Sequence, residues 1–201
     1  MIQYLPQHQT KLLEGFTLED LEYLTDSNPY LRGYLHGYLA ELVLMRKLRT
    51  IPGVDSVVKI PDLDKQKGDL EVQYLGVTMT IECKSIGSGS VKPDESHDSW
   101  TGAVSMKSSD KRKATIDGEE RSFVNVDKGQ FDILAVNCFV VNGSWDFVFI
   151  ENKFLLEKDD TPGYITSRLH INPKTTPGLT ENVSHVLHKV FLQKLSSCEL
   201  K

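Results

Sequence analysis

The chain lacks the features that mark secreted, membrane-spanning and zinc-finger proteins. Its 201 residues include three cysteines, and the odd number and wide spacing of Cys83, Cys138 and Cys198 predict reduced thiols rather than disulfides or a zinc site. No apolar run reaches the roughly 20 residues of a transmembrane helix, and the N-terminus lacks the basic and apolar segments of a signal peptide. We therefore expect a cytoplasmic protein that does not contact membranes.

An excess of positive charge is also missing. The chain has 23 Lys and Arg against 28 Asp and Glu, a net charge of -5, so no protein-wide positive field attracts polyanions. Any nucleic-acid site must therefore be a local basic patch. What the chain does have is a globular composition, 39% hydrophobic and 25% charged, and a length that suits one domain.

Three segments have helical patterns. Thr17-Leu-Glu-Asp20 has the form of a helix cap and predicts a short helix over 17–25. Apolar residues at helical spacing predict a long helix over 30–48 and a closing amphipathic helix over 181–195.

The segment from residue 69 to 84 alternates strictly between apolar and polar side chains, which predicts two strands joined at Leu75-Gly76. In that register Leu70 faces Ile81, and one sheet face is entirely apolar. The same register puts Asp69 opposite Glu82. A shift by one residue would mix polar and apolar side chains on both faces, so the pattern itself fixes the register.

The rest of the chain is assigned more coarsely. We expect a strand over 54–60, a mobile Ser/Gly-rich loop over 85–111, a second hairpin over 113–116 and 121–126, a strand buried on both faces over 131–141, a turn at Asn142-Gly143, a strand over 145–150, and an irregular segment over 162–177.

Three charged groups converge on the first hairpin. Glu82 and Lys84 share one face of their strand, and Asp69 lies beside them on its neighbour, about 4.8 Å away. The two carboxylates can share one Mg²⁺ ion, or Mn²⁺ in its place, with oxygen ligands at about 2.1 Å. The backbone carbonyl of Cys83 can add a further ligand. A divalent ion beside an ammonium is the apparatus of phosphodiester hydrolysis.

This constellation, preceded by a helix that carries Glu41, resembles the active-site core of the PD-(D/E)XK, restriction-endonuclease-like nucleases. The resemblance covers roughly residues 30–84. It implies that Asp69 and Glu82 bind Mg²⁺, that Lys84 assists the nucleophilic water, and that Glu41 is an auxiliary acidic residue of the site.

The resemblance also implies an α/β fold in which a mixed β-sheet is flanked by α-helices. We expect a single nuclease domain over 1–201, with its core at about 29–150 and the helices at 17–25 and 181–195 as additions. The sequence does not place the helix that the family usually inserts before its fourth strand.

The function implied by the resemblance is that of a Mg²⁺-dependent DNA endonuclease in restriction or defence. DNA repair and recombination nucleases, including junction resolvases, use the same core, and a DNA-binding or assembly module that keeps the fold without cleavage is the alternative outside the enzymes. Cutting both strands of a palindrome would favour a homodimer.

Several residues of the hairpin region have a second interpretation. Asp62 follows a proline, as the motif prescribes, and competes with Asp69, although only Asp69 has a position fixed opposite Glu82. The charged residues are alternatively the solvated face of a half-buried hairpin. Glu41 can instead form a salt bridge with a neighbouring Arg46 or Lys47, and Glu71 is a candidate for an outer position in the site.

The main basic cluster follows the first hairpin. Lys107, Lys111, Arg112 and Lys113, with Arg121 nearby, predict contacts with DNA phosphates, and a solvated loop is the alternative. Trp100 could stack on a base or anchor the loop to the body of the protein. His185 and His188 lie on one side of the closing helix, and without a third ligand we interpret them as polar-face residues.

Overall fold

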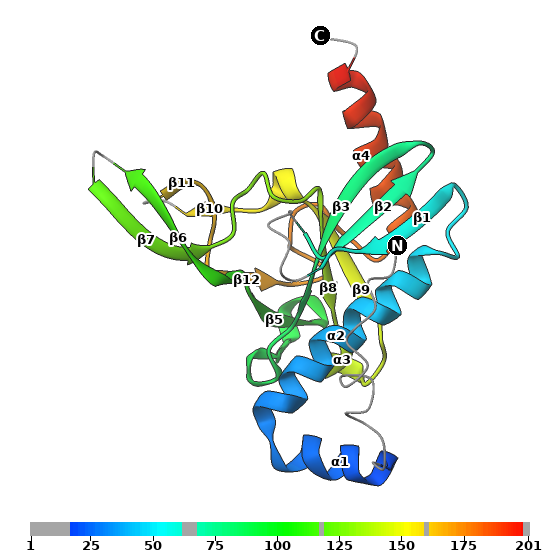
Figure 1. Ribbon diagram of the computed structural model, residues 1–201, viewed down its shortest axis with the longest axis vertical. Coiled ribbons are helices and arrows are strands. Elements are labelled where there is room, and N and C mark those ends of the chain that lie inside the picture. The colour runs from blue at the N-terminus through cyan, green and yellow to red at the C-terminus, as the bar shows by residue number, and fades with distance from the viewer. Residues whose placement is uncertain (1–16, 62–67, 117–118, 159–160, 199–201) are drawn as a thin grey trace, which may run out of the picture. The chain divides into compact units, whose positions relative to one another are not determined.

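The computed structural model (Figure 1) describes residues 17–61, 68–116, 119–158 and 161–198, and within these ranges it describes all side chains except those of 108–125, 161–162 and 198. Contacts divide the chain into two compact units, Met1–Tyr38 and Leu39–Lys201. Each unit is described by itself. Within the described ranges, no helix has the length and apolar character needed to cross a membrane.

The first unit contains helix α1 (Leu18–Ser27) and the beginning of helix α2 (Pro29–Leu48). Thr17 Oγ1 accepts a hydrogen bond from Asp20 N at 3.2 Å, and Asp20 Oδ2 accepts one from Thr17 N at 2.8 Å. This reciprocal pair is the capping box predicted from the sequence. The side chain of Asn28 accepts a backbone N–H from the first turn of α2 and caps it in the same way. Both predicted helices are confirmed.

The second unit is built on a six-stranded mixed sheet with the order β1-β2-β3-β8-β9-β13. Neighbouring strands are antiparallel except β3 and β8, which are parallel. The strands are β1 (Val54–Lys59), β2 (Leu70–Tyr74), β3 (Val77–Ser85), β8 (Ile133–Asn137), β9 (Phe147–Glu151) and β13 (Leu179–Thr180). Parallel strands need a long crossover connection, and the residues between β3 and β8 supply it.

The first hairpin has the register predicted from the sequence. Tyr74 pairs with Val77 and Leu70 pairs with Ile81. The turn residues Leu75 and Gly76 have φ angles of 50° and 77°, and two successive left-handed residues make the tight turn that joins antiparallel strands.

Helices cover one face of the sheet. The part of α2 that belongs to this unit and helix α4 (Val183–Cys198) pack over apolar side chains of β1, β2, β3, β8 and β9 (Figure 1). The helical residues buried there are Ala40, Leu44, Leu48, Val186, Leu187 and Val190. A mixed sheet flanked by helices and the closing helix are therefore confirmed.

A small sheet covers the other face. It has the order β12-β5-β4, from β4 (Lys92–Asp94), β5 (Ser99–Ser105) and β12 (Arg168–Ile171), and it buries a second core against β8 and β9. The first four residues of β8 alternate between the two cores, and the fifth, Asn137, is a buried polar residue. The strand is therefore buried on both faces, as predicted for a central strand.

The prediction of a loop over 85–111 is wrong, because helices and strands make up most of this segment. It contains the short helices η1 (Ser88–Ser90) and η2 (Glu95–His97), strands β4 and β5, and the start of β6 (Lys107–Ile116). Its few apolar residues are nonetheless buried, among them Val104 and Met106. The low density of apolar residues concealed strands that need only one buried face.

Other boundaries also differ from the predictions. The run over 131–141 is not one strand, because the buried Asn137 accepts the Phe139 N–H through Oδ1 at 3.0 Å and starts α3 (Phe139–Asn142). The segment 162–177 is not irregular, since it holds most of β11 and all of β12. The remaining elements are β7 (Glu119–Asn125), which pairs with β6, and η3 (Asn152–Phe154), β10 (Glu157–Lys158) and β11 (Thr161–Ile165). The predicted second hairpin is present but begins earlier, at Lys107.

Candidate active site

Asp69 is fixed where β2 begins. Its Oδ2 accepts a hydrogen bond from the backbone N–H of Cys83 at 2.7 Å. Its own backbone is bonded on both sides, since Ile60 N donates to Asp69 O and Asp69 N donates to Ile81 O, each at 2.9 Å. Gly68 precedes it with a φ of +90°, a conformation that suits glycine. The carboxylate is therefore held against β3 by backbone contacts.

Glu82 and Lys84 project from the same face of β3. Lys84 Nζ lies 2.5 Å from Glu82 Oε1, and the side chains are 12% and 26% exposed for Glu82 and Lys84 respectively. These residues are therefore mostly buried and do not form a solvated hairpin face. A buried charge is stable only when it is paired, and this pair also stands beside Asp69.

Asp69, Glu82 and Lys84 influence one another electrostatically. Burial raises the pKa of Glu82, the Lys84 ammonium opposes that rise, and the Asp69 carboxylate adds to it. Burial disfavours the charged form of Lys84, but the carboxylates of Glu82 and Asp69 outweigh it and the pKa of Lys84 is raised. Lys84 is thus a cation at neutral pH.

The thiol of Cys83 is a poor ligand or nucleophile. Burial raises its pKa well above the ordinary value, and the negative charges of Asp69 and Glu41 raise it further. A thiol acts as a nucleophile or metal ligand through its thiolate. Only the backbone of Cys83 can therefore take part in the site.

Glu41 reaches the border of this group from α2. It forms an ion pair with Lys59 of β1, with 2.7 Å between Oε2 and Nζ, in place of the salt bridge to Arg46 or Lys47 considered from the sequence. The Glu41 and Lys59 side chains are 15% and 29% exposed. The Lys59 ammonium also opposes the rise in the pKa of Glu82, so its charge acts on the site.

Sequence reasoning missed Lys59. The strand that carries it was predicted, but its partner was not, and the relevant signal is the pairing of Lys59 with Leu70, next to Asp69.

The residues fit a Mg²⁺ ion that takes some of its ligands from the protein and the rest from water and substrate. Asp69 and Glu82 offer two carboxylates, and because the N–H and C=O of a strand residue point to the same side, the Cys83 carbonyl faces the Asp69 side of β3. In the part of the chain that the structure describes, no three His, Cys, Asp or Glu side chains gather to hold a metal ion. Mg²⁺ ordinarily binds through one or two carboxylates and completes its shell with water and substrate phosphate, which matches this donor set.

Several predicted residues lie outside the described part or away from the site. Asp62 is not among the described residues, and the same holds for the side chains of Lys111, Arg112 and Lys113, although their backbone belongs to β6. Lys107 begins β6 and is exposed. Glu71 pairs with Val58 and Thr80, farther along the hairpin than Asp69.

Trp100, His185 and His188 lie where their structural interpretations expected them. Trp100 packs against the second core, which agrees with the interpretation that it anchors its segment. His185 and His188 are exposed on α4, as expected for polar-face residues.

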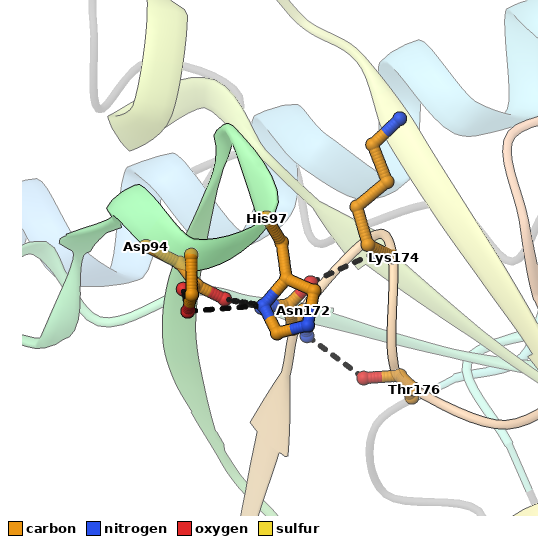
Figure 2. Close-up of polar contacts among 6 residues, drawn as sticks. Asp94, His97, Asn172, Lys174 and Thr176 are labelled. Carbon is orange, nitrogen blue, oxygen red and sulfur yellow. Dashed lines mark hydrogen bonds and ion pairs between the residues drawn. The ribbon is translucent and has the colours of Figure 1, made fainter.

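The structure also reveals a polar cluster that the sequence did not indicate (Figure 2). Asp94 Oδ1 accepts from Ser96 Oγ at 2.6 Å, and Asp94 Oδ2 lies 2.6 Å from Asn172 Nδ2 and 2.8 Å from His97 Nδ1. Asn172 in turn is bonded to Thr176, as Figure 2 shows. The bond between Asp94 and Asn172 ties the end of β4 to the segment after β12, and the bonds from Ser96 and His97 fasten η2 to the same carboxylate.

Comparisons with known proteins give a distant structural likeness. No protein-family model and no curated protein matches the chain. Among solved structures, the chain is similar to a bacterial homing endonuclease, I-Ssp6803I, with a TM-score of 0.44 and 17% identity over 84% of this chain and 98% of that one.

Proposed function

We propose that this chain is a Mg²⁺-dependent DNA endonuclease of the PD-(D/E)XK kind. The observation that carries the proposal is the Asp69 carboxylate bonded to the backbone of Cys83, beside the buried Glu82–Lys84 ion pair. Two carboxylates that can hold a divalent ion, with an ammonium beside them, supply the groups with which metal-assisted phosphodiester hydrolysis can proceed.

Each residue has a role in this mechanism. Asp69 and Glu82, with the Cys83 carbonyl, would hold Mg²⁺, which when bound polarises a phosphoryl oxygen and acidifies a water. Lys84 orients the attacking water and neutralises charge that develops on the phosphate. Glu41, paired with Lys59, is an auxiliary acid that shapes the field at the edge of the site.

Further parts of the proposal rest on the family pattern. Restriction or defence is the setting we favour, and cutting both strands favours a symmetric pair of chains. We assign Lys111, Arg112 and Lys113 to phosphate contacts. The chain departs from the pattern between β3 and β8, where the described residues form strands and short 3-10 turns and no α-helix.

Plasmid cleavage with Mg²⁺ tests the proposal. Asp69→Asn and Glu82→Gln should each abolish cleavage, because each removes a negative charge while keeping an oxygen that accepts a hydrogen bond. The control is Asp55→Asn. Asp55 accepts a hydrogen bond from the backbone of the turn residue Gly76, at the other end of β2 from Asp69, so this variant should cleave DNA at the normal rate. Asp62→Asn should also be mild.

Two results would contradict the proposal. Absence of DNA cleavage by the wild type with Mg²⁺ or Mn²⁺ would refute the proposed nuclease activity. Full cleavage by Asp69→Asn, with loss of cleavage in Asp62→Asn, would refute the assignment of Asp69 as the metal ligand. Thermal unfolding of every variant shows whether lost cleavage reflects lost structure.

A further inference from the structure

The small sheet and the end of β3 line an open hollow of about 380 Å³ that is rich in cations and hydroxyls. Its polar and charged lining residues are Ser85, Ser90, Ser105, Lys107, Ser167 and Arg168. Among the described residues that line it there is no carboxylate. In a chain with a net charge of -5, a hollow with two cations and no acid is a local positive site.

The two cations meet because of strand pairing rather than sequence proximity. Arg168, the first residue of β12, pairs directly with Ser105, the last residue of β5. Met106 N donates to Ser167 O at 3.0 Å and extends the pairing by one step, so Lys107 follows on the same rim as Arg168. Both Lys107 and Arg168 are exposed and can reach a bound anion.

The hollow adjoins the candidate active site through β3. Ser85 follows Lys84 directly and lines the hollow. Asn137 Nδ2 donates to Ser85 Oγ at 3.3 Å, a bond that uses a lone pair of the hydroxyl rather than its O–H. Beyond it, Ile86 bridges to Val104, which joins β5 to the end of β3. A ligand in the hollow therefore lies near the end of the strand that carries Lys84, with the side chains of Ser85 and Lys84 on opposite faces of that strand.

The chemistry of the lining selects a phosphate. A guanidinium and an ammonium bind phosphate oxygens with charge-assisted hydrogen bonds, and the hydroxyls of Ser85, Ser105 and Ser167 add further donors. The Ser90 hydroxyl instead donates to the backbone carbonyl of Gly87 at 2.6 Å. We propose that the hollow binds a backbone phosphate of the DNA at a distance from the phosphate that is cut, and so holds the DNA across the end of β3. This inference rests on the proposed function, because it takes DNA as the substrate.

DNA binding measured against salt concentration tests the inference. The double variant Lys107→Gln with Arg168→Gln is compared with its parent by fluorescence anisotropy, using a labelled duplex and Mg²⁺ in an Asp69→Asn background so that the DNA stays intact. Loss of one phosphate contact should reduce the slope of log affinity against log salt by about 0.9. The loss should be equal for unrelated duplex sequences, since phosphates carry no sequence information.

Two further variants sharpen the test. Lys92→Gln removes an exposed lysine from β4 of the same small sheet, outside the hollow, and should leave the slope unchanged. Ser105→Asp keeps both cations but adds a carboxylate to the exposed rim, and should weaken binding as the double variant does.

The outcomes separate this inference from the proposed function. An unchanged slope in the double variant, or an equal change in Lys92→Gln, would overturn the hollow as a phosphate site even if the wild type cuts DNA. If the wild type binds DNA but does not cleave it, the proposed nuclease activity is wrong. The salt slope of the double variant would still show whether the hollow binds phosphate. A wild type that neither binds nor cuts DNA would overturn both.

Discussion

Lys84 Nζ and Glu82 Oε1 lie 2.5 Å apart on one face of β3. The strand itself makes this contact, since side chains two residues apart share a face. The ammonium is therefore fixed beside a carboxylate that we assign to the metal. That position suits a group that acts on the reacting phosphate after binding.

Lys84→Ala should bind DNA but cleave it at least ~10²-fold more slowly, because a positioned acid–base or electrostatic group contributes on that scale. Both acidic residues remain, so DNA affinity in the presence of Mg²⁺ should stay close to that of the wild type. Single-turnover cleavage and anisotropy binding measure the two effects separately. Undiminished cleavage by Lys84→Ala would remove the lysine from the proposed mechanism.

The Glu41–Lys59 pair should contribute measurably to stability. Both side chains are largely buried, so removing one partner leaves a desolvated charge, and Glu41→Gln should cost about 1–3 kcal/mol of unfolding free energy. A double-mutant cycle with Lys59→Met isolates the coupling between the two residues. The matched control is the exposed pair of Lys47 and Asp146. Lys47 Nζ lies 3.5 Å from Asp146 Oδ1, and the two side chains are 47% and 58% exposed.

That control should show a coupling of about 0–1 kcal/mol, as exposed ion pairs do. Equal coupling in the two cycles would mean that burial adds nothing to the Glu41–Lys59 pair. Mg²⁺ titration of Glu41→Gln cleavage then shows whether Glu41 also supports metal binding, because a purely structural residue leaves the Mg²⁺ requirement unchanged.

The hairpin was predictable because one rule determined it. Period-two alternation fixes which residues face the core, and Leu70 opposite Ile81 then brings Asp69 next to Glu82. The capped helices were predictable for a similar reason, since the signal from Thr17 and Asp20 lies within one turn.

Contacts between distant segments were not predictable in this way. Lys59 joins the site through the pairing of β1 with β2, and Arg168 reaches Lys107 through the pairing of β12 with β5. Neither pairing leaves a local pattern in the sequence. The segment that contains β4 and β5 looked like a loop because it buries only a few apolar residues, such as Val104.

The Asp94 cluster should make stability depend on acid pH. Hydrogen bonds from Ser96 and His97 lower the pKa of Asp94 below its ordinary value. A lowered folded-state pKa stabilises the protein above the unfolded pKa of about 3.9, and that stabilisation is lost as pH falls through the folded pKa. The difference in melting temperature between the wild type and Asp94→Ala should therefore be largest near neutral pH and shrink below about pH 4.

Ser96→Ala removes the first of these hydrogen bonds and keeps the carboxylate, so it should reproduce part of the Asp94→Ala effect. A melting-temperature difference that stays constant from neutral pH to pH 3 would show that the Asp94 carboxylate contributes nothing through its charge.

The buried thiols should resist alkylation in the native protein. Burial raises the pKa of Cys138 to about 11, so at pH 8 only about one thiol in a thousand is thiolate. Cys83 is 7% exposed and its pKa is also raised well above the ordinary value. Iodoacetamide at pH 8, followed by peptide mass mapping, should label both cysteines at least ~10²-fold more slowly than in urea. Rapid labelling of Cys83 in the native protein would show that the strand between Glu82 and Lys84 opens, which is incompatible with a preorganised site on β3.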